Sequence, residues 1–335
     1  MKLKPSLFPA ILLIALLTIQ LLPGCAPSPE RSRLEHIEAI IDEHPDSAMV
    51  LLDSVDTAAL RSDRDRALYG MLLTEALDKN HQDPSNDSLI TSAINYFADY
   101  GDRPREMIAT YYGARVQYLS NDFSHAIVRF FRAKEIAEEL GEHFWHGMAA
   151  RGIADIYYKS FNRAEQLKYA KEEFDNLSLA QRQPYLNYAL LDYATAIYNY
   201  GDYSSAVAFS RQIIDSADAY NDIFLKTDAL KLLGLAKIST SEFSSATLIF
   251  ENLLKSTLAN SSDSLYLCLA YVGDNKPILA KSLLSEISNG DPSLKLAASH
   301  RINEALGNYR DAFSDLNALY NTRDSILRAC LNFID

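Results

Sequence analysis

One local pattern recurs along this chain and limits its fold more than any other feature. A turn is followed by an aromatic residue, two further residues, an alanine, and then apolar residues three or four positions apart. Strong copies occupy residues 121–127, 201–207, 241–246 and 307–313, and weaker copies lead to Ala164 and Ala280. Successive alanines are 38, 42, 40, 34 and 32 residues apart, taken over Ala126, Ala164, Ala206, Ala246, Ala280 and Ala312. A repeat of this length is typical of stacked helical hairpins.

The pattern resembles the tetratricopeptide repeat, a helix–turn–helix unit of about 34 residues. In that repeat a small residue lets the second helix approach the first, and the aromatic residue of the turn fills the wedge between hairpins. The first helix of such a repeat should carry a leucine–glycine pair. Leu233-Gly234 matches this pair well, and residues 113–114 and 193–194 match it loosely. The resemblance implies an all-α, right-handed superhelical solenoid of such hairpins, and we assign residues 103–335 to these repeats.

Residues 33–102 are predicted to form similar but more degenerate hairpins, because their apolar residues also follow a helical period. The segment 44–55 (HPDSAMVLLDSV) resembles the opening of tetratricopeptide lipoproteins of the Bacteroidetes. This resemblance covers most of residues 25–335. Members of that group often continue into a membrane helix and a regulatory segment, whereas this chain ends at Asp335, so we expect either a short member or a truncated one.

The N-terminus has the layout of a secretion signal. Lys2 and Lys4 precede an uncharged apolar stretch, residues 7–22, which is shorter than the roughly 20 residues that a membrane span needs. Residues 22–25 (LPGC) resemble the lipobox of bacterial lipoproteins, in which the cysteine becomes the new N-terminus and carries several acyl chains. The resemblance implies lipidation of Cys25. The alternative is an ordinary signal peptide with a chance cysteine.

The same resemblance makes residues 1–24 a lipoprotein signal peptide that is removed, and residues 25–32 a lipidated, flexible tether. Ala26 follows the cysteine in place of the Asp that retains some lipoproteins in the inner membrane. The tether has one acid, Glu30, and lacks the acidic run that marks surface export in related bacteria. We therefore expect a lipid-anchored protein of the cell envelope, on the periplasmic side of the outer membrane rather than on the cell surface.

Composition excludes some classes of function. The formal net charge is −12, and removal of Lys2 and Lys4 with the signal peptide would bring it to −14. Because such a surface repels phosphate backbones, we do not expect a nucleic-acid partner. We find no clustered nucleophile, base and metal ligands, and no glycine-rich phosphate loop. His143 and His146 could share a helix face, but we interpret them as part of a helix start with Trp145 packed inward. The sequence thus predicts no enzyme, catalytic residue, metal, cofactor or small-molecule substrate.

Tyrosines suggest a binding surface. The chain has 20, and 12 of them fall between Tyr111 and Tyr203. First helices line the inner face of a tetratricopeptide solenoid, and tyrosine gives a large contact area at low entropic cost. By the alanine register the candidates for partner binding are Tyr111, Arg115, Tyr118, Tyr188, Thr195, Tyr198, Asn199 and Lys231. Arg151, Asp155 and Tyr158 join them if the register holds near Ala164. Packing between helices is the alternative for each tyrosine.

We therefore predict a membrane-anchored lipoprotein whose solenoid binds a protein or peptide partner, in a scaffold or assembly role in the cell envelope. One alternative is a SusD-like lipoprotein that binds glycans, although such proteins are usually much longer than this chain. Another is a truncated member of a regulatory sensor family that contains tetratricopeptide repeats.

Overall fold

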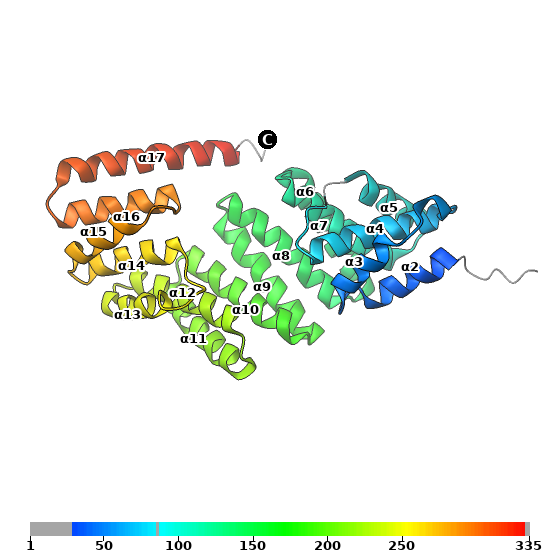
Figure 1. The fold of residues 1–335 in the computed structure, drawn as a ribbon, viewed down its shortest axis with the longest axis horizontal. Helices are drawn as coiled ribbons and strands as arrows, with labels where there is room; N and C mark the ends of the chain where they lie inside the picture. The colour runs from blue at the N-terminus through cyan, green and yellow to red at the C-terminus, as the bar shows by residue number, and fades with distance from the viewer. Residues whose placement is uncertain (1–28, 85–86, 332–335) are drawn as a thin grey trace, which may run out of the picture. The chain divides into compact units, whose positions relative to one another are not determined.

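The structure, a computed structural model, describes residues 29–84 and 87–331. Sixteen α-helices and one short 3-10 helix form the secondary structure of these residues, and none of them lies in a strand (Figure 1). Among the same residues, no helix combines the length and apolar character that a membrane crossing requires. The predicted signal peptide and the predicted lipidation site, Cys25, lie outside the described residues.

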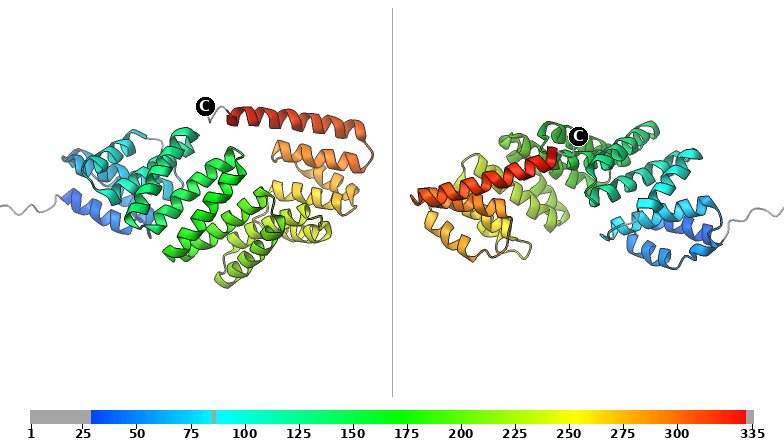
Figure 2. Two further views of the ribbon diagram at one scale, coloured as in Figure 1. Left: turned by 180° about the vertical axis from the view of Figure 1, so that it is seen from behind. Right: turned by 90° about the horizontal axis from the view of Figure 1, so that it is seen from above.

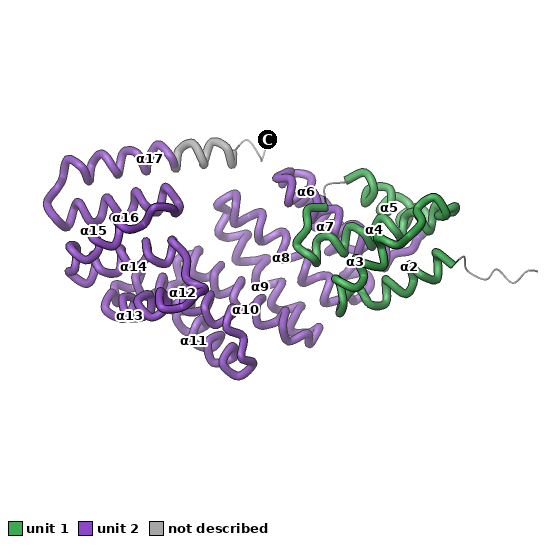
Figure 3. The backbone as a smooth tube through the Cα atoms, viewed as in Figure 1, with its two compact units in different colours: residues 1–100 green, residues 101–335 purple. Residues whose placement is uncertain are grey.

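The chain divides into two compact units, one ending at Tyr100 and the other beginning at Gly101 (Figure 3). The first unit contains α2 (Pro29–Ile40), α3 (Pro45–Asp53), the 3-10 helix η1 (Thr57–Ala59), α4 (Asp63–Lys79) and α5 (Asp87–Asp99). These helices lie where the sequence predicts degenerate hairpins, and they bury a core that includes Leu34, Ile37, Leu52 and Met71.

Helix α2 begins earlier than the sequence predicts. Residues 29–32 were expected to belong to the flexible tether, but they form its first turn. Pro29 suits the first position of a helix, because its missing N–H has no intrahelical partner there. Arg31 then ties this turn to α4, since its Nε donates to Asp65 Oδ1 at 2.8 Å. The folded part of the chain therefore starts at or before Pro29.

The second unit is a row of antiparallel helical hairpins. From α7 onward each helix packs against the one before it, as both views in Figure 2 show. Its helices are α6 (Arg103–Leu119), α7 (Phe123–Leu140), α8 (His143–Lys159), α9 (Arg163–Ala180), α10 (Gln183–Tyr200), α11 (Tyr203–Tyr220), α12 (Ile223–Ser239), α13 (Phe243–Leu253), α14 (Ser261–Gly273), α15 (Pro277–Glu286), α16 (Pro292–Ala305) and α17 (Tyr309–Leu331).

The repeat in this unit is more regular than the alanine spacing indicates. The first helices of four hairpins begin at residues 103, 143, 183 and 223, and the second helices at 123, 163, 203 and 243, so both series advance by 40 residues. Ala126, Ala206 and Ala246 each stand fourth in a second helix, and all three are fully buried. The structural repeat therefore has a constant register from α6 to α13.

The weak copy assigned to Ala164 is displaced by two residues. Phe161 lies in the turn with a φ of 58°, and Asn162 caps α9 by accepting a hydrogen bond from the backbone N–H of Glu165 at 3.3 Å. Phe161 is thus two positions too early to match the aromatic residues that open α7, α11 and α13. As a result the fourth residue of α9 is Gln166, which is buried, where the other second helices have a buried alanine. Ala164 is exposed.

Small residues allow close approach between helices, as predicted for Gly234. A Cβ atom at Gly234 would lie 2.6 Å from the ring of Phe250, which is fully buried in the second helix of the same hairpin. We therefore expect Gly234→Ala to lower the free energy of unfolding by about 1–3 kcal/mol, because overpacking forces the ring to move. Urea denaturation measures this change.

The double variant Gly234→Ala/Phe250→Leu provides the control. The smaller leucine leaves space for the new methyl group, so the two substitutions together should cost less than the sum of their separate effects. Strictly additive changes in the free energy of unfolding would show that contact with Phe250 is not the reason why a larger residue at position 234 destabilises the protein.

Candidate functional site

Tyr118, Tyr158 and Tyr198 form a tyrosine ladder. They occupy the last two turns of α6, α8 and α10 and are 40 residues apart, so they share one register on the first helices. First helices of successive hairpins pack against each other for α6–α8, α10–α12, α12–α14 and α14–α16. Among the described residues no two second helices pack this closely, so the first helices line the inner face of the solenoid.

The rungs of the ladder differ in exposure and chemistry. Tyr118 is the most enclosed: Arg115 lies 5.8 Å and Lys159 5.6 Å from the centre of its ring, and burial raises the pKa of its hydroxyl to about 12. Tyr158 is 49 % exposed. The Tyr198 hydroxyl lies 3.3 Å from Ser239 Oγ of α12. The Arg163 guanidinium lies 4.8 Å from the centre of the Tyr158 ring. The ladder therefore offers one half-exposed ring, with a cation already beside it, between two more firmly held rings.

A pocket of about 300 Å³, here called the central pocket, opens between α8, α9 and α10. Helices α8 and α10 approach one another less closely than the other neighbouring first helices do, and α9 closes the space behind them. Ala170 leaves room in this wall. At the same register α7 and α13 carry the large rings of Phe130 and Phe250, and α11 carries the small Ser210. The lining residues are Ala154, Asp155, Tyr158, Gln166, Ala170, Glu173, Asp192 and Thr195.

The central pocket contains three carboxyl groups, and two arginines lie beside it. Arg163 is at its edge, where it donates to Gln166 Oε1 at 3.1 Å, and Arg151 lies among the acids. Arg151 Nη2 lies 3.2 Å from Asp192 Oδ2, and Arg151 Nε lies 3.9 Å from Glu173 Oε1. The Glu173 side chain is 1 % exposed, and neither of its carboxyl oxygens has a hydrogen-bond partner in the protein. An excess of acid is therefore enclosed at this point of the inner face.

Enclosure changes the acidity of each group. Burial raises the pKa of Glu173 well above its usual range and that of Asp155 to about 6, although the charge of Arg151 opposes both shifts. Burial also raises the pKa of Asp192, again against the effect of Arg151. For Arg151 itself burial disfavours the charge, but the three surrounding acids outweigh it and raise its pKa. The arginine thus stays charged, and the carboxyl groups compete for it.

Several of the predicted partner-binding residues lie at the ladder and the central pocket. Thr195 lines the pocket, and Asn199 Nδ2 donates to Gln166 Oε1 at 3.4 Å beside it. Arg115 lies beside the Tyr118 ring. Arg151, Asp155 and Tyr158 were predicted only if the register held near Ala164. Asp155 and Tyr158 line the central pocket, and Arg151 pairs with two of its acids.

The remaining predicted residues, Tyr111, Tyr188 and Lys231, contact other parts of the protein. Tyr111 is only 6 % exposed, because its ring packs against Tyr112, Phe130 and Trp145 in the core. The Tyr188 hydroxyl lies 3.5 Å from Asp222 Oδ1, at the start of α12. Lys231 Nζ lies 3.5 Å from Asp228 and 3.7 Å from Asp263. Tyr111 therefore offers little surface to a partner.

Sequence reasoning missed Gln166, Glu173 and Asp192. The 40-residue register is the signal that could have found them. Glu173 takes a position held by Ala133, Ile213 and Leu253, and Asp192 one held by Tyr112, Gly152 and Leu232, all of them buried. The two-residue displacement at Ala164 hid the equivalence of Gln166 and Glu173, both on α9, to buried residues of the other second helices. With the register corrected, three polar side chains appear where the equivalent hairpins have apolar or small ones.

The histidine pair connects two helices of one hairpin. His143 Nδ1 lies 3.0 Å from Asn176 Oδ1, and His146 Nε2 lies 2.7 Å from Glu172 Oε1, both on α9. His146 and Lys134 lower the pKa of Glu172 to about 2 through their hydrogen bonds. Within residues 29–84 and 87–331, no three His, Cys, Asp or Glu side chains are grouped so that they could hold a metal ion.

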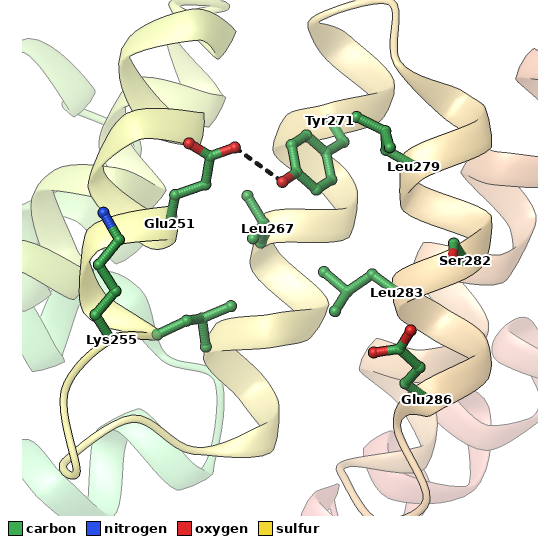
Figure 4. A pocket seen from close by; sticks show the side chains of 9 residues that line it. Glu251, Lys255, Leu267, Tyr271, Leu279, Ser282, Leu283 and Glu286 are labelled. Carbon is green, nitrogen blue, oxygen red and sulfur yellow. Dashed lines mark hydrogen bonds between the residues drawn. The ribbon is translucent and has the colours of Figure 1, made fainter.

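A second hollow of about 440 Å³ lies between α13, α14 and α15 (Figure 4). The Tyr271 hydroxyl donates to Glu251 Oε1 at 2.8 Å, and burial together with this bond raises the Tyr271 pKa to about 12. Leucines 254, 267, 279 and 283 form much of its wall. None of the predicted site residues lines this hollow. Of its two acids, Glu251 accepts the Tyr271 hydrogen bond and Glu286 is exposed, so the central pocket is the stronger candidate.

No family model matches this chain, and no curated protein matches its sequence. Solved structures do share its fold. A Rap protein complexed with Competence and Sporulation Factor has a TM-score of 0.61 at 13 % identity, covering 89 % of this chain and 99 % of that one. NprR in complex with its cognate peptide NprX has a TM-score of 0.58 at 11 % identity, covering 91 % and 88 %.

A signal transduction ATPase from Pyrococcus horikoshii that carries a tetratricopeptide repeat sensor is also similar. Its TM-score is 0.60 at 16 % identity over 90 % of this chain, which spans about half (47 %) of that protein. At these identities the likeness concerns the fold alone. The chain is an all-α superhelical solenoid of tetratricopeptide-like hairpins, which confirms the fold class predicted from the sequence.

The central pocket should give the protein a pH-dependent stability. Because the Glu173 pKa is higher in the folded than in the unfolded chain, the folded protein keeps this proton as pH rises above about 4.5. Stability therefore falls with rising pH until the folded pKa is passed, by about 1.4 kcal/mol for each unit of the shift. Glu173→Gln removes this loss, so its stability relative to wild type should increase between pH 5 and pH 8 in urea denaturation.

Glu165→Gln is the matched control, since Glu165 lies on the same helix but is partly exposed and pairs with Lys168 at 3.1 Å. Its stability relative to wild type should change little over the same range. A Glu173→Gln difference that is equal at both pH values would mean that the buried carboxyl does not titrate abnormally.

Proposed function

We propose that this chain is a non-enzymatic, membrane-anchored lipoprotein whose solenoid binds a peptide, or an extended segment of a protein partner, on its inner face. The observation that carries the proposal is the tyrosine ladder beside the central pocket. The role we infer is that of a scaffold or assembly factor in the cell envelope, of the kind suggested by the resemblance to Bacteroidetes tetratricopeptide lipoproteins.

The dimensions of the ladder suit an extended peptide. Packed helices lie about 8–10 Å apart, so the three rungs span at least about 16–20 Å. An extended chain advances about 3.3 Å per residue, and five or six residues would therefore reach from Tyr118 to Tyr198. Tyrosines contribute apolar area and a hydroxyl at low entropic cost, which suits recognition of a chain with mixed side chains.

Two proteins of the same fold support a peptide as the partner. NprR was solved with its cognate peptide NprX, and a Rap protein with Competence and Sporulation Factor. Their sequences are too distant to transfer residues, but they make peptide binding by such a solenoid a reasonable starting point for this chain.

The membrane anchor rests on the sequence. The charged start, the apolar stretch and the LPGC motif at residues 22–25 support lipidation of Cys25. Several acyl chains on one residue hold a protein on a membrane far more firmly than a single chain does. We place the solenoid in the envelope, most simply on the periplasmic side of the outer membrane.

Partner binding should depend on the exposed rung of the ladder. The variant Tyr158→Ala removes a ring that is 49 % exposed, and we expect recovery of a crosslinked partner from envelope extract to fall about tenfold or more, as for an interface hot spot. The full chain, purified in mild detergent, serves as the bait, and quantitative mass spectrometry compares what wild type and variant recover.

Tyr220→Ala is the control for this experiment. Tyr220 ends α11, a second helix, and is 59 % exposed, so the same truncation is made away from the ladder. It should recover the partner as wild type does. Equal recovery by Tyr158→Ala and wild type would contradict binding on the inner face.

Lipidation predicts a separate result in cells. Wild-type protein should incorporate an alkyne-labelled palmitate and fractionate with membranes, whereas Cys25→Ser should lose the label and the membrane association of the mature form. Cys268→Ser is the matched control, because Cys268 is a free, fully buried thiol whose pKa burial raises to about 12. Label retained by Cys25→Ser would exclude Cys25 as the acceptor.

A further inference from the structure

Glu173 differs from the other deeply buried acids of this protein. Glu106 accepts hydrogen bonds from Arg103 at 2.7 Å and from Arg132 at 3.1 Å, and Asp263 accepts one from the backbone N–H of Asn260 at 2.8 Å. Glu173 is equally buried, lines the central pocket, and has no hydrogen-bond partner in the protein for either oxygen. A buried polar group left in this state is costly, by about 1–3 kcal/mol.

The fold does not need an acid at this position. The equivalent hairpins place Ala133, Ile213 and Leu253 there, and each is at most 4 % exposed. Replacing buried ion pairs by apolar residues is often neutral or stabilising. Since a solenoid with an apolar residue at this register packs well, the presence of Glu173 calls for a cause outside folding.

Two further polar substitutions converge on the same pocket. Gln166 takes the place of Ala126, Ala206 and Ala246, and Asp192 that of buried residues in the other first helices. Glu173, Gln166 and Asp192 come from two helices and all line one space of about 300 Å³. Three polar residues at positions that are buried in the equivalent hairpins therefore surround one pocket, which indicates a common role.

We propose that the central pocket receives a cationic side chain, a guanidinium or primary ammonium group, from the peptide that the inner face binds. This inference rests on the function proposed above and names the residue class that the site selects. The ligand cation donates to both oxygens of Glu173 and to Asp155, while Arg151 continues to hold Asp192. Tyr158, at the edge of the pocket, already has the Arg163 guanidinium 4.8 Å from its ring centre, so the ligand cation meets the remaining exposed part of this ring.

The charges around the pocket favour a cation over an anion. Asp155 and Arg151 face Glu173 from α8, and Asp192 faces it from α10. Further out, Arg115 and Lys159 act on Asp155, and Asp228 of α12 acts on Asp192. Arg163 lies at the pocket edge, where it donates to Gln166 Oε1 at 3.1 Å. Among the three carboxyl groups themselves lies one guanidinium, that of Arg151, so once these acids ionise an incoming cation balances the enclosed charge, whereas an anion would add to the excess.

Size is consistent with an organic cation. At about 30 Å³ for one water, a space of about 300 Å³ corresponds to roughly ten water volumes. This accommodates the end of an arginine or lysine side chain together with a few waters. A bare metal ion is a poorer occupant, because no three acidic or histidine side chains of the described residues are arranged to ligate one.

The test uses a bead-displayed library of random hexapeptides and the full chain in mild detergent. We expect the selected peptides to share an arginine or lysine at one position. The strongest binder is then made with citrulline in place of that arginine, or acetyl-lysine in place of that lysine, which removes the charge. Wild-type protein should bind the uncharged peptide at least about tenfold more weakly, and this ratio should widen from pH 5 to pH 8 as the acids ionise.

Glu173→Gln should bring the ratio close to one, while Glu165→Gln should leave it unchanged. The comparison of the two peptides on wild-type protein needs no variant, so it stands even if Glu173→Gln folds poorly. Selected peptides that lack a basic residue, or equal affinity for the charged and uncharged peptides, would overturn the cation pocket but leave peptide binding intact. A library that yields no binder at all would overturn both proposals.

Discussion

The hairpins depend on one constraint, the close approach of a large ring to a small residue on a neighbouring helix. Phe250 reaches Gly234 within its own hairpin, and Phe130 reaches Gly152 of the next, where an added Cβ would lie 2.4 Å from the ring. Interiors packed this tightly fix the helices in angle and in register. The two rings hold the same position in α7 and α13, whereas α9 and α11 have Ala170 and Ser210 there. The 40-residue spacing that aligns the tyrosines of successive first helices therefore also depends on the buried alanines Ala126, Ala206 and Ala246.

The candidate site departs from the packing of α7 and α13. Where those helices carry a phenylalanine, α9 and α11 both carry a small residue, Ala170 and Ser210, and beside Ala170 the space is lined by acids instead of aliphatic side chains. Folding alone favours an apolar filling, since an acid without a hydrogen-bond partner is expensive to bury. The site is therefore distinguished by the acids around this space, more than by the small residue that leaves it open.

The sequence predicted the fold well because the repeated alanines report packing directly. Ala126, Ala206 and Ala246 are buried at equivalent positions, and the helical period between them leaves few other arrangements. The site was predicted in part. Tyr118, Thr195 and Tyr198 follow from the register, but Glu173 and Asp192 do not, because a charged residue in an amphipathic helix ordinarily faces solvent. The early aromatic Phe161 shifted the expected register at α9 and hid that Glu173 occupies a core position.

The separation of α8 from α10 also bears on how the solenoid deforms. In a repeat array each unit contacts only its neighbours, so the compliances of the individual junctions add. Other junctions of the second unit combine contacts between first helices with contacts through a second helix, whereas this one relies on α9 against α10. We therefore expect this joint to yield more than its neighbours, so that the spacing between residues on its two sides, such as Asp155 and Thr195, changes when the array curves.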